Sequence, residues 1–181
     1  MKYDILLAGF GGQGILLFGR IIAQAAMREG RNVTYLPSYG PEMRGGTCNC
    51  MVVINDNEIA SPVINDADVV VAMNQPSCDK FGPRVRAEGL LLVNATLAET
   101  PAEHHNGCRV VGAPFTELAG DLGDVRVSSV VALGRLVHET QFAGPETVLA
   151  QIRELTAKRP ELLEINERAF NLGLSCATAV E

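Results

Sequence analysis

Two glycine-rich stretches contain the residues best suited to bind a ligand. The first is residues 9–14, GFGGQG, and the second is residues 38–47, SYGPEMRGGT; each comes after an apolar, strand-like run. Because the loops that follow parallel strands open on one edge of an α/β sheet, we expect the two stretches to form one site. That site would hold an anion or the backbone of a partner at a helix start, with an arginine beside it.

The first stretch fits the Gly-x-Gly-x-x-Gly pattern, with glycines at positions 9, 11 and 14. In a dinucleotide-binding domain this pattern is accompanied by an acidic residue about 20 residues further on, which holds the ribose. Residues 33–38 contain no aspartate or glutamate, so a free-standing nicotinamide dehydrogenase is disfavoured. Two interpretations of the glycines stay open: they allow a phosphate to bind at the helix start, or they serve only close packing. Gln13 could donate to a cofactor or cap a neighbouring backbone, and the sequence does not decide between these roles.

The second stretch contains an arginine between small residues. The planar guanidinium of Arg44 can bind a phosphate or a carboxylate with two hydrogen bonds, and Gly45 and Gly46 leave room for that group to approach. Glu42 lies two residues away and can orient the guanidinium. The alternative is a surface ion pair between Glu42 and Arg44, which would contribute less than about 1 kcal/mol.

The segments around these stretches alternate between apolar strands and amphipathic helices. Pro37 is expected to end its strand, and residues 48–54 are expected to pair with 58–61 in a hairpin. The predicted fold is α/β: a three-layer, Rossmann-like, mostly parallel sheet with an inserted β-hairpin and a helical C-terminal third, in a single domain over residues 1–181. The expected strands are 3–9, 32–36, 48–54, 58–61, 68–73, 89–94 and 109–112, with helices at 15–29, at 77–85 and after Pro114.

Composition excludes several classes of partner. The 181 residues are 47% hydrophobic, enough for a continuous core, and 15 basic against 21 acidic side chains give a net charge of −6. No run of lysine or arginine stands out, so neither nucleic acid nor an anionic membrane is expected as a partner. The sequence contains no apolar run of the roughly 18–20 residues that cross a bilayer, and its start leads into a strand instead of a signal peptide. We therefore expect a cytoplasmic protein.

The five cysteines are an odd number without Cys-x-x-Cys spacing, which favours reduced thiols over disulfides. An iron–sulfur cluster within this chain is not expected, and Cys48 and Cys50, which share a strand face, are expected to pack as small apolar groups. Spacing reveals no metal-ligating set, Ser-His-Asp triad or pair of catalytic carboxylates. Any chemistry is therefore expected to belong to an assembled complex.

Together, residues 8–14, 39–46, 59–62 and 68–76 resemble the gamma subunit, or gamma domain, of the 2-oxoacid:ferredoxin oxidoreductases. The similarity runs from about residue 3 to residue 140. Residues 37–46 and 74–77 are most similar to the 2-oxoglutarate and branched-chain 2-oxoacid branches. The indolepyruvate branch differs in the second stretch.

The resemblance implies a subunit of a CoA-acylating enzyme that decarboxylates a 2-oxoacid, with 2-oxoglutarate favoured, and passes electrons to ferredoxin. Thiamine diphosphate and iron–sulfur clusters would lie on partner subunits. These partners would be the alpha and beta subunits, and whether a delta subunit joins them stays open. This chain would be inactive alone and would serve assembly and the coenzyme A side. A stand-alone nucleotide-binding protein and a purely structural assembly subunit are the alternatives. The candidate cofactor or subunit contacts carried over by the resemblance are Gly11, Gly12, Gln13, Gly14, Tyr39, Glu42, Arg44, Gly45 and Gly46.

One departure concerns the start of the helix near residue 130. Members of the family commonly carry asparagine there, whereas this chain has Ser128 and Ser129. A serine can also accept a hydrogen bond from a backbone N–H at a helix start, so either is expected to cap the helix.

Overall fold

The computed structural model describes residues 1–39, 47–101, 107–157 and 159–176, with the backbone alone at positions 39 and 47. Its strands are β1 Lys2–Phe10, β2 Asn32–Tyr39, β3 Thr47–Asn55, β4 Ala67–Ala72, β5 Val85–Asn94 and β6 Arg109–Ala113. Its α-helices are α1 Ile15–Arg28, α2 Gln75–Phe81, α3 Phe115–Asp121, α4 Ser128–Thr140, α5 Pro145–Thr156 and α6 Pro160–Ser175, with 3₁₀ turns η1 Gly82–Arg84 and η2 Val125–Val127.

The strands form one sheet in the order β2-β3-β1-β4-β5-β6. β1, β4, β5 and β6 are parallel neighbours, whereas β3 runs antiparallel to both β1 and β2. The parallel strands are apolar along most of their length because both of their faces are covered. The carboxyl ends of β1, β4, β5 and β6 consequently lie along one edge, which we call the carboxyl edge.

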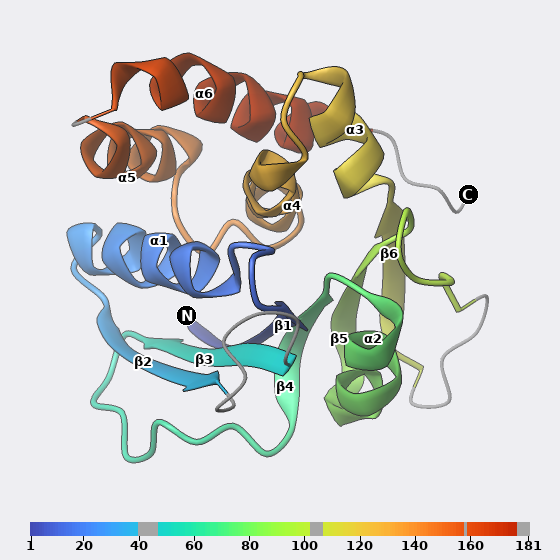
Figure 1. The fold of residues 1–181 in the computed structure, drawn as a ribbon. Coiled ribbons are helices and arrows are strands. Elements are labelled where there is room, and N and C mark those ends of the chain that lie inside the picture. The colour runs from blue at the N-terminus through green and yellow to red at the C-terminus, as the bar shows by residue number, and fades with distance from the viewer. Residues whose placement is uncertain (40–46, 102–106, 158, 177–181) are drawn as a thin grey trace.

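Helices cover both faces of the sheet (Figure 1). Side chains alternate along β1, so that Ile5 and Leu7 enter the larger core cluster beneath α1 and α4, while Leu6 and Ala8 enter the smaller cluster beneath α2. Helices α5 and α6 pack outside α1 and α4. The predicted three-layer α/β fold with a helical C-terminal third is confirmed.

Two details of the predicted sheet are wrong. Residues 58–61 form no strand; the antiparallel partner of β3 is β2, which pairs with it from Asn32↔Asn55 to Tyr39↔Cys48. Pro37 does not end β2, which continues to Tyr39. Proline is tolerated because β2 is the edge strand, where a missing N–H need not interrupt a ladder.

Glycines set the closest helix–helix contact. A Cβ added to Gly173 in α6 would overlap the carbonyl oxygen of Val131 in α4, and one added to Gly134 in α4 would overlap the carbonyl oxygen of Phe170 in α6. The two helix backbones therefore touch directly at this crossing. Among the described residues, no helix combines the length and apolar character that a membrane span requires.

Candidate functional site

The site lies where the sheet changes its direction of winding. After β1 the chain enters α1 on one face, and after β4 it enters α2 on the other. The carboxyl ends of these adjacent strands therefore diverge, and in open α/β sheets such a switch point is the usual place for a ligand. The first glycine stretch leaves β1 at this point.

The glycine turn adopts backbone conformations that only glycine accepts readily. Gly12 has φ +102° and is exposed, and Gly14 has φ +75° and forms the start of α1. The first turn of α1 contains no acidic residue and no side-chain cap. Its leading N–H groups therefore lack partners within the helix and can bind an anion.

Gln13 fixes the turn instead of extending from it. Its Oε1 accepts hydrogen bonds from the Phe10 N–H at 2.7 Å and from Nδ2 of Asn74 at 2.8 Å. Its Nε2 donates to the carbonyl oxygen of Met73 at 3.1 Å. The side-chain amide thus ties the end of β1 to the end of β4. Of the two roles that the sequence left open for Gln13, the structure shows the hydrogen bonds to neighbouring backbone groups.

Two asparagines extend this arrangement along the carboxyl edge. Asn74 caps α2 by accepting from the Ser77 N–H at 3.0 Å. Asn94, at the end of β5, donates to the Met73 carbonyl at 3.2 Å and to Oγ1 of Thr116 at 2.8 Å. Both are almost fully buried. We call Gln13, Asn74 and Asn94 the amide network. The sequence analysis did not identify either asparagine as a site residue. The available signal was their position, because each directly follows a buried apolar strand and so lies at the carboxyl edge.

The start of α4 also reaches the glycine turn. A Cβ on Gly14 would lie 2.5 Å from Oγ of Ser129. Ser128 and Ser129 are the first two residues of α4, and neither caps it, so the predicted serine cap is wrong. The preceding turn, η2, is instead capped by Asp124, which accepts from the Arg126 N–H at 2.9 Å.

The second stretch can be placed only by its flanks. Tyr39 pairs with Cys48, Cys48 pairs with Gly9, and Thr47 pairs with Phe10. The strand ends on either side of the stretch therefore lie at the carboxyl edge beside the glycine turn, as predicted. Four of the candidate contacts lie outside the described residues: Glu42, Arg44, Gly45 and Gly46.

The strand order adds a second argument against a dinucleotide site of the usual kind. Such a site needs β2 directly beside β1, so that an acidic residue at its end reaches the ribose. Here β3 lies between β1 and β2, which moves the end of β2 about 5 Å further from the glycine turn.

Comparison with known proteins identifies the family. A family model described as pyruvate ferredoxin/flavodoxin oxidoreductase matches residues 4–176. The chain belongs to this family. Ketoisovalerate oxidoreductase subunit VorA from Methanothermobacter marburgensis is 42% identical over 96% of the chain, and 2-oxoglutarate synthase subunit KorC from Methanocaldococcus jannaschii is 33% identical over 98% of it. The match covers 95% of KorC but only 36% of VorA, so the chain spans about a third of the latter's length.

Solved structures agree with this assignment. The gamma subunit of a keto/oxoacid ferredoxin oxidoreductase from Geobacter sulfurreducens is 31% identical, with a TM-score of 0.78 over 94% of this chain and 95% of that one. The resemblance to gamma subunits is thereby confirmed. A 2-oxoglutarate:ferredoxin oxidoreductase from Magnetococcus marinus, 23% identical, shares the fold with a TM-score of 0.88 over 99% of this chain and 32% of that one.

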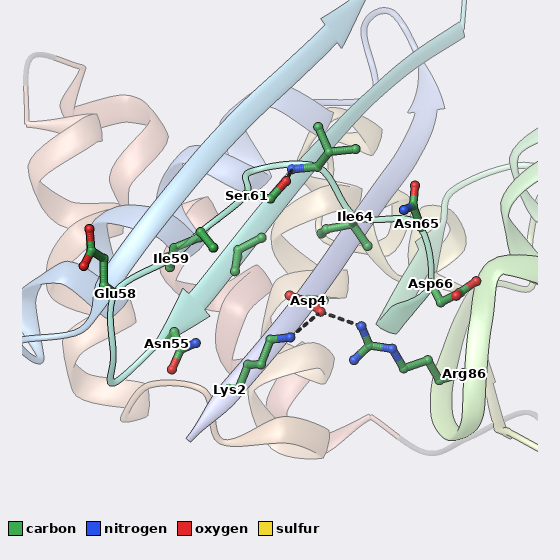
Figure 2. Close-up of a pocket in the computed structure, with 13 residues that line it drawn as sticks. Lys2, Asp4, Asn55, Glu58, Ile59, Ser61, Ile64, Asn65, Asp66 and Arg86 are labelled. Atoms are coloured by element: carbon green, nitrogen blue, oxygen red, sulfur yellow. Dashed lines mark hydrogen bonds and ion pairs between the residues drawn. The ribbon is translucent and has the colours of Figure 1, made fainter.

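This family member has a hollow of about 480 Å³ at the opposite edge of the sheet (Figure 2). Arg86 bridges the carboxylates of Asp4 at 2.7 Å and Asp68 at 2.5 Å, and Lys2 lies 3.1 Å from Asp4. The two positive and two negative charges of this group compensate one another. We therefore assign these four residues to stability and not to ligand binding.

Replacing Arg86 with methionine should destabilise this family member without affecting its activity. The side chain of Asp4, 8% exposed, would keep only Lys2 as a cationic partner. We expect a loss of about 2 kcal/mol in the free energy of unfolding, less than for a fully buried pair because Arg86 is 39% exposed. Urea unfolding measures this loss. Arg153→Met, which breaks the exposed pair with Glu167, is the control and should change nothing measurable; equal stability of the two variants would contradict the assignment.

The cysteines of this family member are structural. All five are buried free thiols, and Cys48 and Cys50 lie in the same core cluster, as predicted. Burial raises the pKa of the Cys50 thiol to about 12, and it also raises the pKa of Cys48. Thiols of this kind are poor nucleophiles and metal ligands at neutral pH. The described residues offer no group of three His, Cys, Asp or Glu side chains that could hold a metal ion.

Proposed function

We propose that this chain is the gamma-type subunit of a CoA-acylating 2-oxoacid:ferredoxin oxidoreductase and supplies part of the coenzyme A side of its site. The observation that carries the proposal is the family match over residues 4–176, combined with a glycine turn whose helix start is uncapped at the switch point of the sheet. An uncapped helix start favours a phosphate-bearing ligand. The Magnetococcus enzyme, which shares the fold, is described with coenzyme A and succinyl-CoA bound.

The favoured 2-oxoacid is 2-oxoglutarate. KorC from Methanocaldococcus jannaschii matches this chain over nearly the full length of both proteins, whereas VorA is a much longer chain. A branched-chain 2-oxoacid is the alternative, because the identity to VorA is higher. The pocket for the 2-oxoacid would lie mainly on other subunits.

Within the complex, the residues of this chain would bind and orient coenzyme A. The N–H groups at the start of α1 would bind a phosphate, while the amide network holds the turn in place. Thiamine diphosphate, which supplies decarboxylation, would lie on the alpha and beta subunits. The iron–sulfur clusters, which supply electron transfer, would also lie on partner subunits, because the buried thiols described above do not suit a cluster. Ferredoxin would accept the electrons of the complex.

An apolar surface supports the assembly role. Leu17 and Met27 on α1 are 43% and 61% exposed. A hollow of about 670 Å³ lies along α1 beside Tyr35. An exposed apolar strip that adjoins a candidate site is typical of a subunit contact.

The proposal is tested by reconstitution. The chain should copurify with its partner subunits, and the complex should oxidise a 2-oxoacid in a coenzyme A-dependent reaction followed with a viologen dye. Omission of this chain should abolish that activity. A fully active complex formed without it would contradict the proposal. Tight binding of NAD or FAD by the isolated chain, measured by calorimetry, would instead favour a stand-alone nucleotide-binding protein.

A purely structural subunit makes a different prediction. In that case Arg44→Ala would weaken subunit association and leave the apparent affinity for coenzyme A unchanged. Under our proposal the same variant raises the KM for coenzyme A in the assembled complex, because the guanidinium would contact the ligand.

A further inference from the structure

One side of α1 has the residue spacing of a contact between two helices. Its members recur at intervals of four, three and four positions: Leu16, Arg20, Ala23 and Met27, with Leu17 beside the first. Residues at these intervals form a single stripe along a helix, against which a second helix can pack. The stripe extends over about 16 Å. We call these five residues the α1 stripe.

The α1 stripe faces solvent at the side where the sheet ends. α1 packs on β2 and β3 and against α5 (Figure 1). β2 is an edge strand, so the sheet offers no further strand on which another helix could lie beside α1. The hollow of about 670 Å³ between the stripe and Tyr35 is therefore open on this side. Its floor is fixed, because the Tyr35 hydroxyl donates to the Leu16 carbonyl oxygen at 3.1 Å.

Exposed apolar side chains are concentrated on this helix. Leu17 and Met27 are both exposed, and in the part of the chain that the structure describes no other helix has two exposed large apolar side chains. Single exposed apolar residues are normal on any protein, whereas two on one helical stripe beside an open hollow indicate a contact surface. The unbranched methionine side chain adapts readily to the surface of a partner.

Arg20 is the charged member of the α1 stripe. The other arginine of α1, Arg28, pairs with Glu154 of α5. Arg20 is exposed and makes no hydrogen bond or ion pair with any described residue. A guanidinium that is covered by a partner loses its hydration and needs a carboxylate in compensation. The occupant of the stripe must therefore supply an acidic side chain.

This requirement argues against a second copy of the chain as the occupant. Two copies could pair their α1 helices antiparallel, with the small side chain of Ala23 allowing close approach. However, α1 contains no acidic residue, so such a pair would place no carboxylate of α1 opposite Arg20. A different polypeptide satisfies the requirement.

The relatives indicate where such a polypeptide comes from. The match covers 95% of KorC but 36% of VorA, so this domain occurs both as a separate chain and as about a third of a longer one. A domain found in both arrangements needs a surface that contacts the rest of the enzyme. The α1 stripe starts at the second residue of α1, directly after the glycine turn, so it adjoins the candidate site.

We propose that the α1 stripe binds an amphipathic helix of a partner subunit of the oxidoreductase, and that this helix presents a carboxylate to Arg20 between apolar side chains that contact Leu17 and Met27. The inference rests on the proposed function, because it defines the surface used in the assembly role. Apolar anchors on the helix would supply affinity. Arg20 would supply specificity, because a helix without the acidic residue would leave the guanidinium covered and unpaired.

Arg20→Glu and Met27→Glu test the proposal through the Kd of the full chain for its purified partner subunits, measured by biolayer interferometry. Each change puts a negative charge into the covered stripe, so we expect the Kd to rise about tenfold or more. Both positions are exposed, so the melting temperature should stay within about 2 °C of the parent value. Arg168→Glu changes an exposed arginine of α6, which also lacks a partner among the described residues, and should leave the Kd within about twofold.

Arg20→Met separates recognition of a carboxylate from simple apolar contact. If the partner supplies a carboxylate, this variant leaves it unpaired, and the Kd should rise about tenfold. The Kd of the parent should also rise more steeply with salt than the Kd of the variant. An Arg20→Met chain that binds as tightly as the parent, with the same salt dependence, would overturn the proposal.

A photocrosslinker in place of Met27 identifies the occupant in the assembled complex. We expect mass spectrometry to find the crosslink on a helical segment of a partner subunit that carries an acidic residue. A crosslink to a second copy of this chain, or to no polypeptide, would overturn the proposal.

The parent chain separates failure of this inference from failure of the proposed function. If the parent forms the active complex and both glutamate variants bind the partner subunits with the parent Kd, the α1 stripe is not the contact and the proposed function stands. If the parent chain does not bind the partner subunits at all, the proposed function is wrong and the inference fails with it.

Discussion

Gly173→Ala is expected to separate α4 from α6 and to cost the protein about 3 kcal/mol or more of stability. The added Cβ would overlap the carbonyl oxygen of Val131, which belongs to helix backbone and cannot rotate away. One of the two helices must therefore shift, and the core contacts of Phe170 and Leu133 shift with it. For a chain of this size the melting temperature should fall by roughly 10 °C, which differential scanning fluorimetry can measure.

Gly120→Ala is the matched control for this substitution. Gly120 also lies in a helix, but its added Cβ would meet only Cγ1 of Val125 at 3.7 Å, an ordinary contact. Alanine favours the helix more than glycine does, so Gly120→Ala should be neutral or should stabilise by up to about 1 kcal/mol. A Gly173→Ala protein that melts within a degree or two of the parent would show that the α4–α6 crossing has room for an added methyl group.

Gln13→Ala should lower stability and also weaken the binding of coenzyme A, because Gln13 makes three hydrogen bonds that hold the glycine turn. Without it, the Phe10 N–H and the Asn74 amide lose their acceptor, and the Met73 carbonyl oxygen keeps only its bond from Asn94. We expect a loss of about 2 kcal/mol in stability, since the turn is half-buried and water can replace part of the bonding. In the assembled complex the KM for coenzyme A should rise about tenfold or more, because the turn is misplaced.

Gln13→Glu distinguishes the structural from the electrostatic contribution. Glutamate keeps the acceptor for Phe10 and Asn74 but cannot donate to the Met73 carbonyl, and it adds a negative charge at the start of α1. The KM for coenzyme A should then rise further than in Gln13→Ala. Gln75→Ala removes a half-buried amide from the same edge, which among the described residues bonds only to Asp79 and to the Glu99 N–H, and should change the KM for coenzyme A by no more than about twofold. Unchanged kinetics in both Gln13 variants would show that the amide network does not position the site.

The elements with local signals could be predicted from the sequence. The buried strands that become β4 and β5 read as continuous apolar runs, and the glycine turn was correctly placed between β1 and α1. The pairing of β3 could not be predicted, because its asparagine- and aspartate-rich end resembles a hairpin turn. The choice of β2 as its partner is made by tertiary packing between strands, which no local pattern encodes.

The partners of the site residues depend on contacts over long sequence separations. Gln13 meets Asn74 across 61 residues, and Gly14 meets Ser129 across most of the domain. A single sequence contains the polar residues at the ends of strands but not the distances between them. The amide network and the meeting of α1 with α4 therefore emerge only from the structure.

The decisive measurement is a structure of the assembled complex with coenzyme A bound. We expect a phosphate of coenzyme A within hydrogen-bond distance of the N–H groups at the start of α1. Coenzyme A bound wholly on other subunits, with the glycine turn facing solvent or buried against a partner chain, would contradict it.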